Sequence, residues 1–252
     1  MLCEKPLALR RREAESLFDL ARTRGVLLLP AHVVRFAQSS IWLRDAVGSG
    51  RYGPVREAFF SRLSTRPHWC AGGWAYDRAR SGLVPYDLHI HDLDLMVSLF
   101  GPPQSAVVEG SGSRSLPFDE HNWFSYQYPG FRVTAEAAWY VAVIPFTASW
   151  RVSFESALAL CRNDRVIRYK HGRPPCVPAD RPEAAQETGI SVPATDMYDR
   201  ELACFVQCIR TGQPPALLPP GEVLAVLGIL EAMVLEQPYG GQEEPLAERN
   251  RR

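Results

Sequence analysis

One stretch of the sequence brings together side chains that could move protons. Residues 85–100 read P-Y-D-L-H-I-H-D-L-D-L-M-V-S-L-F and are followed by Gly-Pro-Pro. Proline suits a first helical turn and Gly-Pro-Pro ends a helix, so this stretch is predicted to be one helix. Its other positions are mostly apolar, which predicts burial. Four polar residues recur at i, i+4, i+7 and i+11 and therefore share one face: Asp87, His91, Asp94 and Ser98.

This polar line has two interpretations. Buried unpaired charge is costly, so the line must face either internal partners or a solvated cleft. In the first interpretation, an Asp–His pair only holds the core together. In the second, His91 is a general acid/base and Asp87 lies in the same cleft, because histidine titrates near neutral pH and a nearby carboxylate tunes it. The spacing alone leaves both open.

A metal site is not predicted. His89 and His91 form an H-x-H pair, which would share one face of a strand but points in different directions on a helix. The six cysteines include no C-x-x-C pair. Cys204 and Cys208 are spaced i, i+4 on a predicted helix, where two small buried side chains are the better interpretation.

Composition limits the partners of the chain. The 252 residues are 46% hydrophobic and 22% charged, with a formal net charge of zero. Neither nucleic acid nor an anionic membrane is therefore a predicted partner. The sequence shows no leader peptide and no apolar run of membrane-spanning length, which predicts a cytoplasmic protein.

The first part of the chain is predicted to form a strand–helix–strand unit. A strand ends near Cys3, a turn follows at Glu4-Lys5-Pro6, residues 7–24 form an amphipathic helix, and residues 26–29 form a strand buried on both faces. Such a unit implies parallel strands. Two short parallel strands are not stable alone, so this part of the chain is expected to lack its neighbours.

The remainder predicts an α+β fold with a mainly antiparallel sheet covered by helices. An irregular segment at 64–80, rich in aromatic residues and glycine and including Trp74, is expected to border a cleft. Hairpin turns are expected at 128–131 and 163–164, a loop at 172–193 and a frayed tail at 240–252. Strands are expected at 55–63, 105–109, 122–128, 131–140, 146–154, 157–161 and 165–169, and helices at 39–47, 196–210 and 222–236.

Five elements in this order resemble the Gfo/Idh/MocA family of nicotinamide-dependent sugar and cyclitol oxidoreductases. They cover nearly the whole chain, and each alone is weak. They are the E-K-P turn at 4–6, the R-F pair at 35–36, the helix-to-strand turn G-S-G-R-Y-G-P-V at 48–55, the D-x-x-x-H-D-x-D pattern at 87–94, and the late helix at 198–212.

The resemblance implies specific roles. Lys5, Asp87 and His91 would be catalytic, with Lys5 contacting the reacting hydroxyl. Glu4, Lys5 and Pro6 would contact NAD or NADP. The substrate-binding residues implied for a sugar-like polyol are Arg35, Trp74 and Asp94.

The chain departs from the family pattern at its beginning. Family members start with a full Rossmann domain, whereas this sequence has no G-x-G-x-x-G followed by a helix. Residues 1–36 are therefore interpreted as the last βαβ unit of a dinucleotide-binding domain, and residues 37–252 as the substrate and oligomerisation domain. We expect a misplaced start or a truncated gene, no NAD(P) binding by the chain alone, and a homo-oligomer formed through the sheet.

An alternative stays open at this level. The same substrate domain could serve as a cofactor-free binding or assembly module. It could also be an acid–base enzyme, such as a hydrolase, that uses Asp87 and His91.

Overall fold

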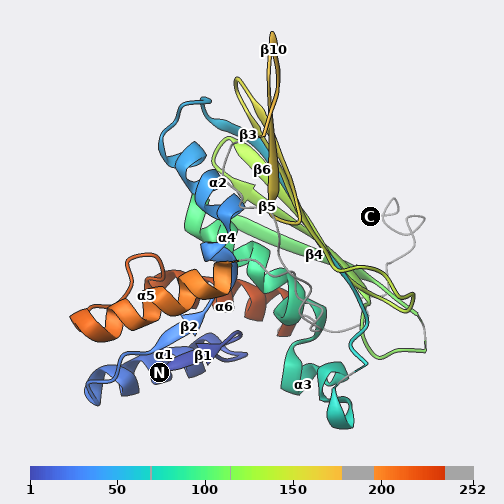
Figure 1. Cartoon of the computed structure of the whole chain (residues 1–252). Coiled ribbons are helices and arrows are strands. Elements are labelled where there is room, and N and C mark those ends of the chain that lie inside the picture. The colour runs from blue at the N-terminus through green and yellow to red at the C-terminus, as the bar shows by residue number, and fades with distance from the viewer. Residues whose placement is uncertain (69, 114, 178–195, 236–252) are drawn as a thin grey trace, which may run out of the picture.

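The structure is built on one large sheet with helices packed on one of its faces (Figure 1). It is a computed structural model that describes residues 1–68, 70–113, 115–177 and 196–235. The eight strands are ordered β10-β9-β8-β7-β3-β6-β5-β4. Their bounds are β3 Val55–Thr65, β4 Ser105–Ser111, β5 His121–Tyr128, β6 Phe131–Tyr140, β7 Thr147–Phe154, β8 Leu158–Arg162, β9 Arg165–Lys170 and β10 Arg173–Cys176.

The predicted α+β class is confirmed. Only β3 and β6 pair in parallel within this sheet; its other neighbouring strands are antiparallel. The predicted turn between β8 and β9 is present, and Asn163 and Asp164 both have positive φ, as a two-residue hairpin of type I′ requires. Strand β10 was not expected, because it lies within the predicted loop at 172–193.

A second, two-stranded parallel sheet joins β1 (Leu2–Glu4) and β2 (Leu29–Ala31), with α1 (Arg11–Thr23) between them. The strand–helix–strand order is as predicted, but the boundaries differ. Helix α1 begins four residues late because the Glu13 carboxylate accepts the Arg10 backbone N–H at 3.3 Å and fixes the first turn there. Val26, predicted to be buried in the second strand, precedes β2 and is 48% exposed.

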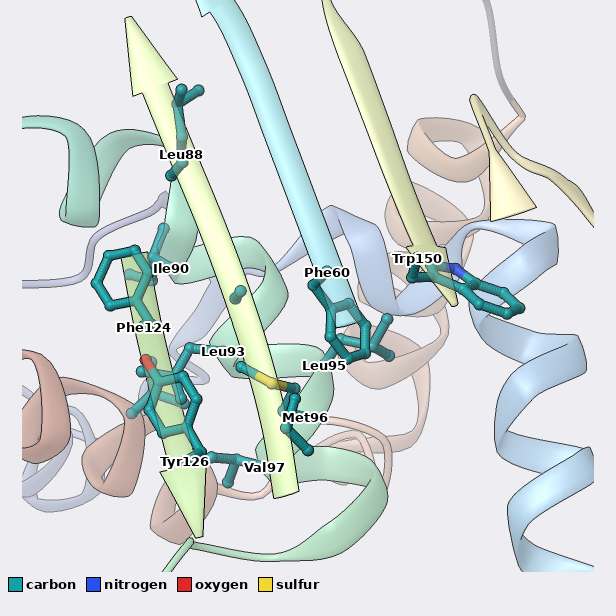
Figure 2. Close-up of a cluster of buried hydrophobic side chains, with 14 of the residues drawn as sticks. Phe60, Leu88, Ile90, Leu93, Leu95, Met96, Val97, Phe124, Tyr126 and Trp150 are labelled. Atoms are coloured by element: carbon teal, nitrogen blue, oxygen red, sulfur yellow. The ribbon is translucent and has the colours of Figure 1, made fainter. Parts of the chain in front are cut away.

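The predicted central helix consists of two parts. A π-helical turn, η3 (Pro85–His89), leads directly into α4 (Ile90–Phe100). A π turn is wider than an α turn and changes the direction in which the preceding side chains point. Figure 2 shows how α4 packs its apolar face, including Leu93 and Met96, against Phe60 and Tyr126 of the sheet.

The other helices surround this packing. They are η1 (Val33–Phe36), α2 (Gln38–Gly48), η2 (Ala71–Tyr76), α3 (Arg78–Ser81), α5 (Met197–Thr211), α6 (Pro220–Leu230) and η4 (Glu231–Leu235). The segment predicted to be irregular thus contains η2 and α3. Residues 178–193 of the predicted loop and the predicted tail at 240–252 lie outside the described residues. None of the described helices is long and apolar enough to cross a membrane.

A buried ion pair joins η1 to the central helix. Arg35 and Asp94 are 0% and 1% exposed, and two hydrogen bonds of 2.7 Å connect the guanidinium to the carboxylate. Arg35 also donates to the Leu217 carbonyl at 2.7 Å and to the Glu222 carboxylate. Burial lowers the pKa of Arg35, but the Asp94 and Glu222 carboxylates more than offset that effect, so the net shift is upward. Because Glu222 belongs to α6, the Arg35 guanidinium joins η1, α4 and α6.

Asp94→Asn should destabilise the fold, because it leaves a buried guanidinium without its main counter-charge. We expect a loss of about 3–5 kcal/mol in the free energy of unfolding, measured by urea titration. Asp19→Asn is the matched control, since the Asp19–Arg22 pair is on the surface with side chains 69% and 77% exposed. It should change stability by about 0.5 kcal/mol or less. Equal losses in the two variants would contradict this role of Asp94.

Candidate active site

A cavity of about 320 Å³ lies between the central helix and the sheet. Three of its lining residues come from distant parts of the sequence: Lys5 follows β1, Asp87 lies in η3 and His91 lies in the first turn of α4. They form what we call the reaction end of the cavity. The structure therefore places all three predicted catalytic residues on the wall of one cavity.

Lys5 is fixed by Asp87. Its ammonium donates to the Asp87 carbonyl at 2.6 Å and lies 3.1 Å from Asp87 Oδ1. The other carboxylate oxygen accepts a hydrogen bond from Trp139 Nε1 at 3.3 Å. An ammonium has three N–H donors, and Asp87 engages two of them. The third donor remains for a ligand in the cavity.

His91 lines the cavity. Its Nδ1 is buried and has no hydrogen-bond partner in the described part of the chain, so we expect Nε2 to be the ring nitrogen that meets a ligand. Burial, followed by the positive charges of Lys5 and Arg62, lowers the pKa of His91 well below its ordinary value of 6.5. The imidazole is therefore neutral at pH 7 and able to accept a proton.

His89 has a structural role instead. Its Nε2 lies 2.6 Å from the Tyr126 hydroxyl, and its ring stacks on Phe124 with centroids 3.7 Å apart. Burial lowers its pKa to about 3. As expected for a helix, His89 and His91 point to different surroundings. Within the described ranges, no group of three or more His, Cys, Asp or Glu residues could hold a metal ion.

An ion pair that sequence reasoning missed also lines the cavity. Arg62 of β3 binds Asp92 of α4 through two hydrogen bonds of 2.8 and 3.2 Å, and both side chains are buried. Burial raises the pKa of Asp92, and the guanidinium offsets part of that rise. The signal was present in the alternation of β3, because Ala58, Phe60 and Arg62 occupy the same face.

The predicted substrate-binding residues lie elsewhere. Arg35 and Asp94 hold each other in the core, where their hydrogen bonds are satisfied, and they do not line the cavity. Asp87 and His91 line the cavity, whereas Asp94 faces Arg35 of η1. Trp74 is 37% exposed on η2 and is also absent from the cavity wall. Their substrate contacts stay predictions, and this cavity does not support them.

The residues predicted to contact the cofactor surround Lys5. Glu4 ends β1 at the surface and Pro6 is half-buried next to Lys5. A literal G-x-G-x-x-G does occur at residues 48–53, but it connects α2 to β3. A dinucleotide loop connects a strand to a helix, which is the opposite order. A Cβ atom at Gly53 would clash with the Glu155 side chain, so this glycine makes room for a contact within the protein and not for a cofactor phosphate.

Comparison with known proteins places this arrangement in a family. Residues 41–155 match the GFO/IDH/MocA C-terminal domain. Residues 41–155 therefore belong to the GFO/IDH/MocA family as its C-terminal domain. The match covers most of α2, then β3, the central helix and the sheet through β7, and it includes half of the residues that line the cavity.

Two of the curated relatives are sugar reductases. It is 36% identical over 110 residues to 1,5-anhydro-D-fructose reductase of Ensifer adhaerens, covering 42% of this chain and 32% of that protein. It is 28% identical over 214 residues to dTDP-3,4-didehydro-2,6-dideoxy-alpha-D-glucose 3-reductase of Streptomyces violaceoruber, covering 83% and 60%. The aligned part of the chain thus spans 32% and 60% of the length of these two relatives.

The fold also matches solved structures. A levoglucosan dehydrogenase in complex with NADH and levoglucosan superimposes with a TM-score of 0.75 at 15% identity, over 93% of this chain and 70% of that one. At that identity the likeness establishes the fold alone.

The low pKa of His91 can be tested by an NMR pH titration. Its ring signals, assigned by their loss in His91→Asn, should titrate well below pH 6.5. In Lys5→Met the midpoint should move upward, because one of the positive charges that oppose protonation is gone; burial, the larger cause, remains. Lys170 is the only other lysine in the sequence and is exposed, so Lys170→Met is the matched control and should not move the midpoint. A His91 titration midpoint at or above pH 6.5 in the unmodified chain would contradict the lowered pKa of His91.

Proposed function

We propose that this chain is the substrate-binding and proton-transferring part of an NAD(P)-dependent oxidoreductase that acts on a CH–OH group of a sugar-like polyol. The observation that carries the proposal is the contact between Lys5 and Asp87 on the wall that also holds His91. Lys5 from the turn at residues 4–6 and the Asp87–His91 pair from the central helix can therefore contact the same ligand. The sugar reductases among the relatives support the same substrate class.

The geometry accounts for the proton side of the reaction. In the oxidation direction, neutral His91 accepts the proton of the substrate hydroxyl at Nε2 while the adjacent carbon loses hydride. The third N–H of Lys5 donates to the substrate oxygen and stabilises its developing negative charge. Asp87 keeps the ammonium in place, and Trp139 keeps the carboxylate in place.

NAD or NADP, when bound, supplies the hydride acceptor. Glu4 is the last residue of β1, and Lys5 and Pro6 follow it. Ligands of parallel sheets bind at the carboxyl ends of strands. These residues therefore fit the nicotinamide end of the cofactor. The part of the chain that the structure describes contains no strand–glycine turn–helix for the phosphates. A related fold has been observed with NADH, which supports this choice of cofactor class.

Arg35 and Asp94 act indirectly in this proposal. Their ion pair fixes α4 against η1 and so sets the position of His91, three residues before Asp94. They are positioning residues. The division at residue 36, the homo-oligomer through the sheet and the cytoplasmic location stay predictions.

Replacing the three residues should remove hydride transfer and leave the fold intact. His91→Asn should lower kcat by about 10²–10⁴-fold. Asp87→Asn and Lys5→Met should also lower kcat, because each disturbs the donor to the substrate oxygen. The assay follows NAD(P)H absorbance with a panel of sugars and polyols, using the protein as its full reading frame encodes it. Lys170→Met is the matched control and should keep full activity.

Two results would contradict the proposal. One is turnover in His91→Asn equal to that of the unmodified protein. The other is cofactor-independent hydrolysis that depends on Asp87 and His91, since that would support the acid–base alternative instead.

A further inference from the structure

The cavity extends well beyond the reaction end. Across the sheet, Arg62 of β3 pairs with Ala148 of β7, and Ala148 exchanges hydrogen bonds of 2.8 and 3.2 Å with Asn163 in the β8–β9 turn. Neighbouring strands lie about 4.8 Å apart, so the cavity-lining residues of β3 and β8, with β7 between them, are about 10 Å apart across the sheet. That length exceeds one sugar ring. We call the part around Ala148, Trp150, Asn163 and Asp164 the hairpin end.

A hollow with aromatic walls occupies the hairpin end. Phe146, Ala148 and Trp150 alternate along the β7 segment and therefore face the same side of the sheet, and all three line the cavity. The small side chain of Ala148 leaves space between two rings. Trp150 is held from behind by Trp42, with ring centroids 6.3 Å apart and an interplanar angle of 14°. A rigid aromatic face beside a hollow suits the C–H face of a sugar ring.

Polar groups surround this hollow. Asn163 Oδ1 accepts the Ala148 N–H, while its amide N–H groups make no hydrogen bond within the described ranges. Asp164 Oδ1 accepts the Ser39 N–H at 2.7 Å, which leaves the second oxygen as an acceptor. Ser40 lines the cavity, is 1% exposed, and its hydroxyl has no partner in the described part of the chain. Donors and acceptors around an aromatic platform match the hydroxyl groups of a carbohydrate.

Charge argues against a phosphorylated ligand. The cavity wall carries two permanent cations and three carboxylates. Lys5 is paired with Asp87 and Arg62 with Asp92, whereas Asp164 has only a neutral backbone N–H. The hairpin end is therefore negative overall and would repel a pyrophosphate.

We propose that the hairpin end is a second sugar-ring subsite, and that the substrate is a neutral glycoside or disaccharide whose first ring reacts at Lys5 and His91. This inference rests on the proposed function and specifies its substrate class. Asn163 and Asp164 hydrogen-bond the second ring, and Trp150 packs against it.

The test measures sugar binding by calorimetry with the chain itself. The probes are common hexoses and pentoses, disaccharides that contain them, and UDP-glucose and dTDP-glucose. A disaccharide should bind at least about 10-fold more tightly than its monosaccharides. Ala148→Leu fills the hollow and should remove that advantage while changing monosaccharide affinity by less than about 2-fold. Thr147→Leu is the matched control: it lies next along β7, faces the other side of the sheet and is absent from the cavity wall.

The outcomes separate this inference from the proposed function. Monosaccharide binding that is lost in Lys5→Met, with no gain from a second ring, would overturn the subsite alone. Binding of no sugar at all would contradict both. Tightest binding of a nucleotide sugar, with sensitivity to Ala148→Leu, would overturn the neutral substrate class. If Ala148→Leu does not fold, Asn163→Gly keeps the positive-φ turn, removes the amide, and should weaken disaccharide binding selectively.

Discussion

The site depends on the contact between Lys5 and Asp87. Eighty-two residues separate them in sequence, yet the ammonium reaches both the carbonyl and the carboxylate of Asp87. This contact joins the small parallel sheet to the central helix, and the cavity has its reaction end there. The pair is partly exposed, with side chains 16% and 42% accessible, so it contributes little to stability. In the proposed function, its importance lies in holding Lys5 on the cavity wall that His91 also lines.

The buried ion pairs explain how that contact stays in place. Arg35–Asp94 fixes the central helix to η1, and Arg62–Asp92 fixes it to the sheet. Asp92 and Asp94 follow His91 closely, so the imidazole is held by two pairs that point in different directions. The apolar face of α4 fills the remaining space against the sheet. The fold thereby positions a neutral imidazole in a partly polar cavity without metal ligands from the described residues.

The sequence predicted the fold class, most of the strands and the grouping of Lys5, Asp87 and His91, because these follow from strand periodicity, turn residues and ordered family motifs. It did not predict the π turn at residues 85–89, since the pattern of polar residues also fits a regular helix. In the structure Asp94 faces Arg35, whereas Asp87 lines the cavity. The alternation of β3 placed Arg62 on the same face as Phe60, but its partner Asp92 was missed because that pairing joins elements 30 residues apart in sequence. Asn163 was recognised only as a turn residue, since its place on the cavity wall depends on pairing between distant strands.

The central claim is that Lys5 and His91 act on one substrate atom as a unit. A double-mutant cycle on kcat/KM with Lys5→Met, His91→Asn and the combined variant tests it most directly. Residues that act as a unit show non-additive losses. The combined variant should therefore lose about as much kcat/KM as the more strongly impaired of the two single variants. If instead the two losses multiply, the residues work independently, and the assignment of one shared reaction site would be wrong.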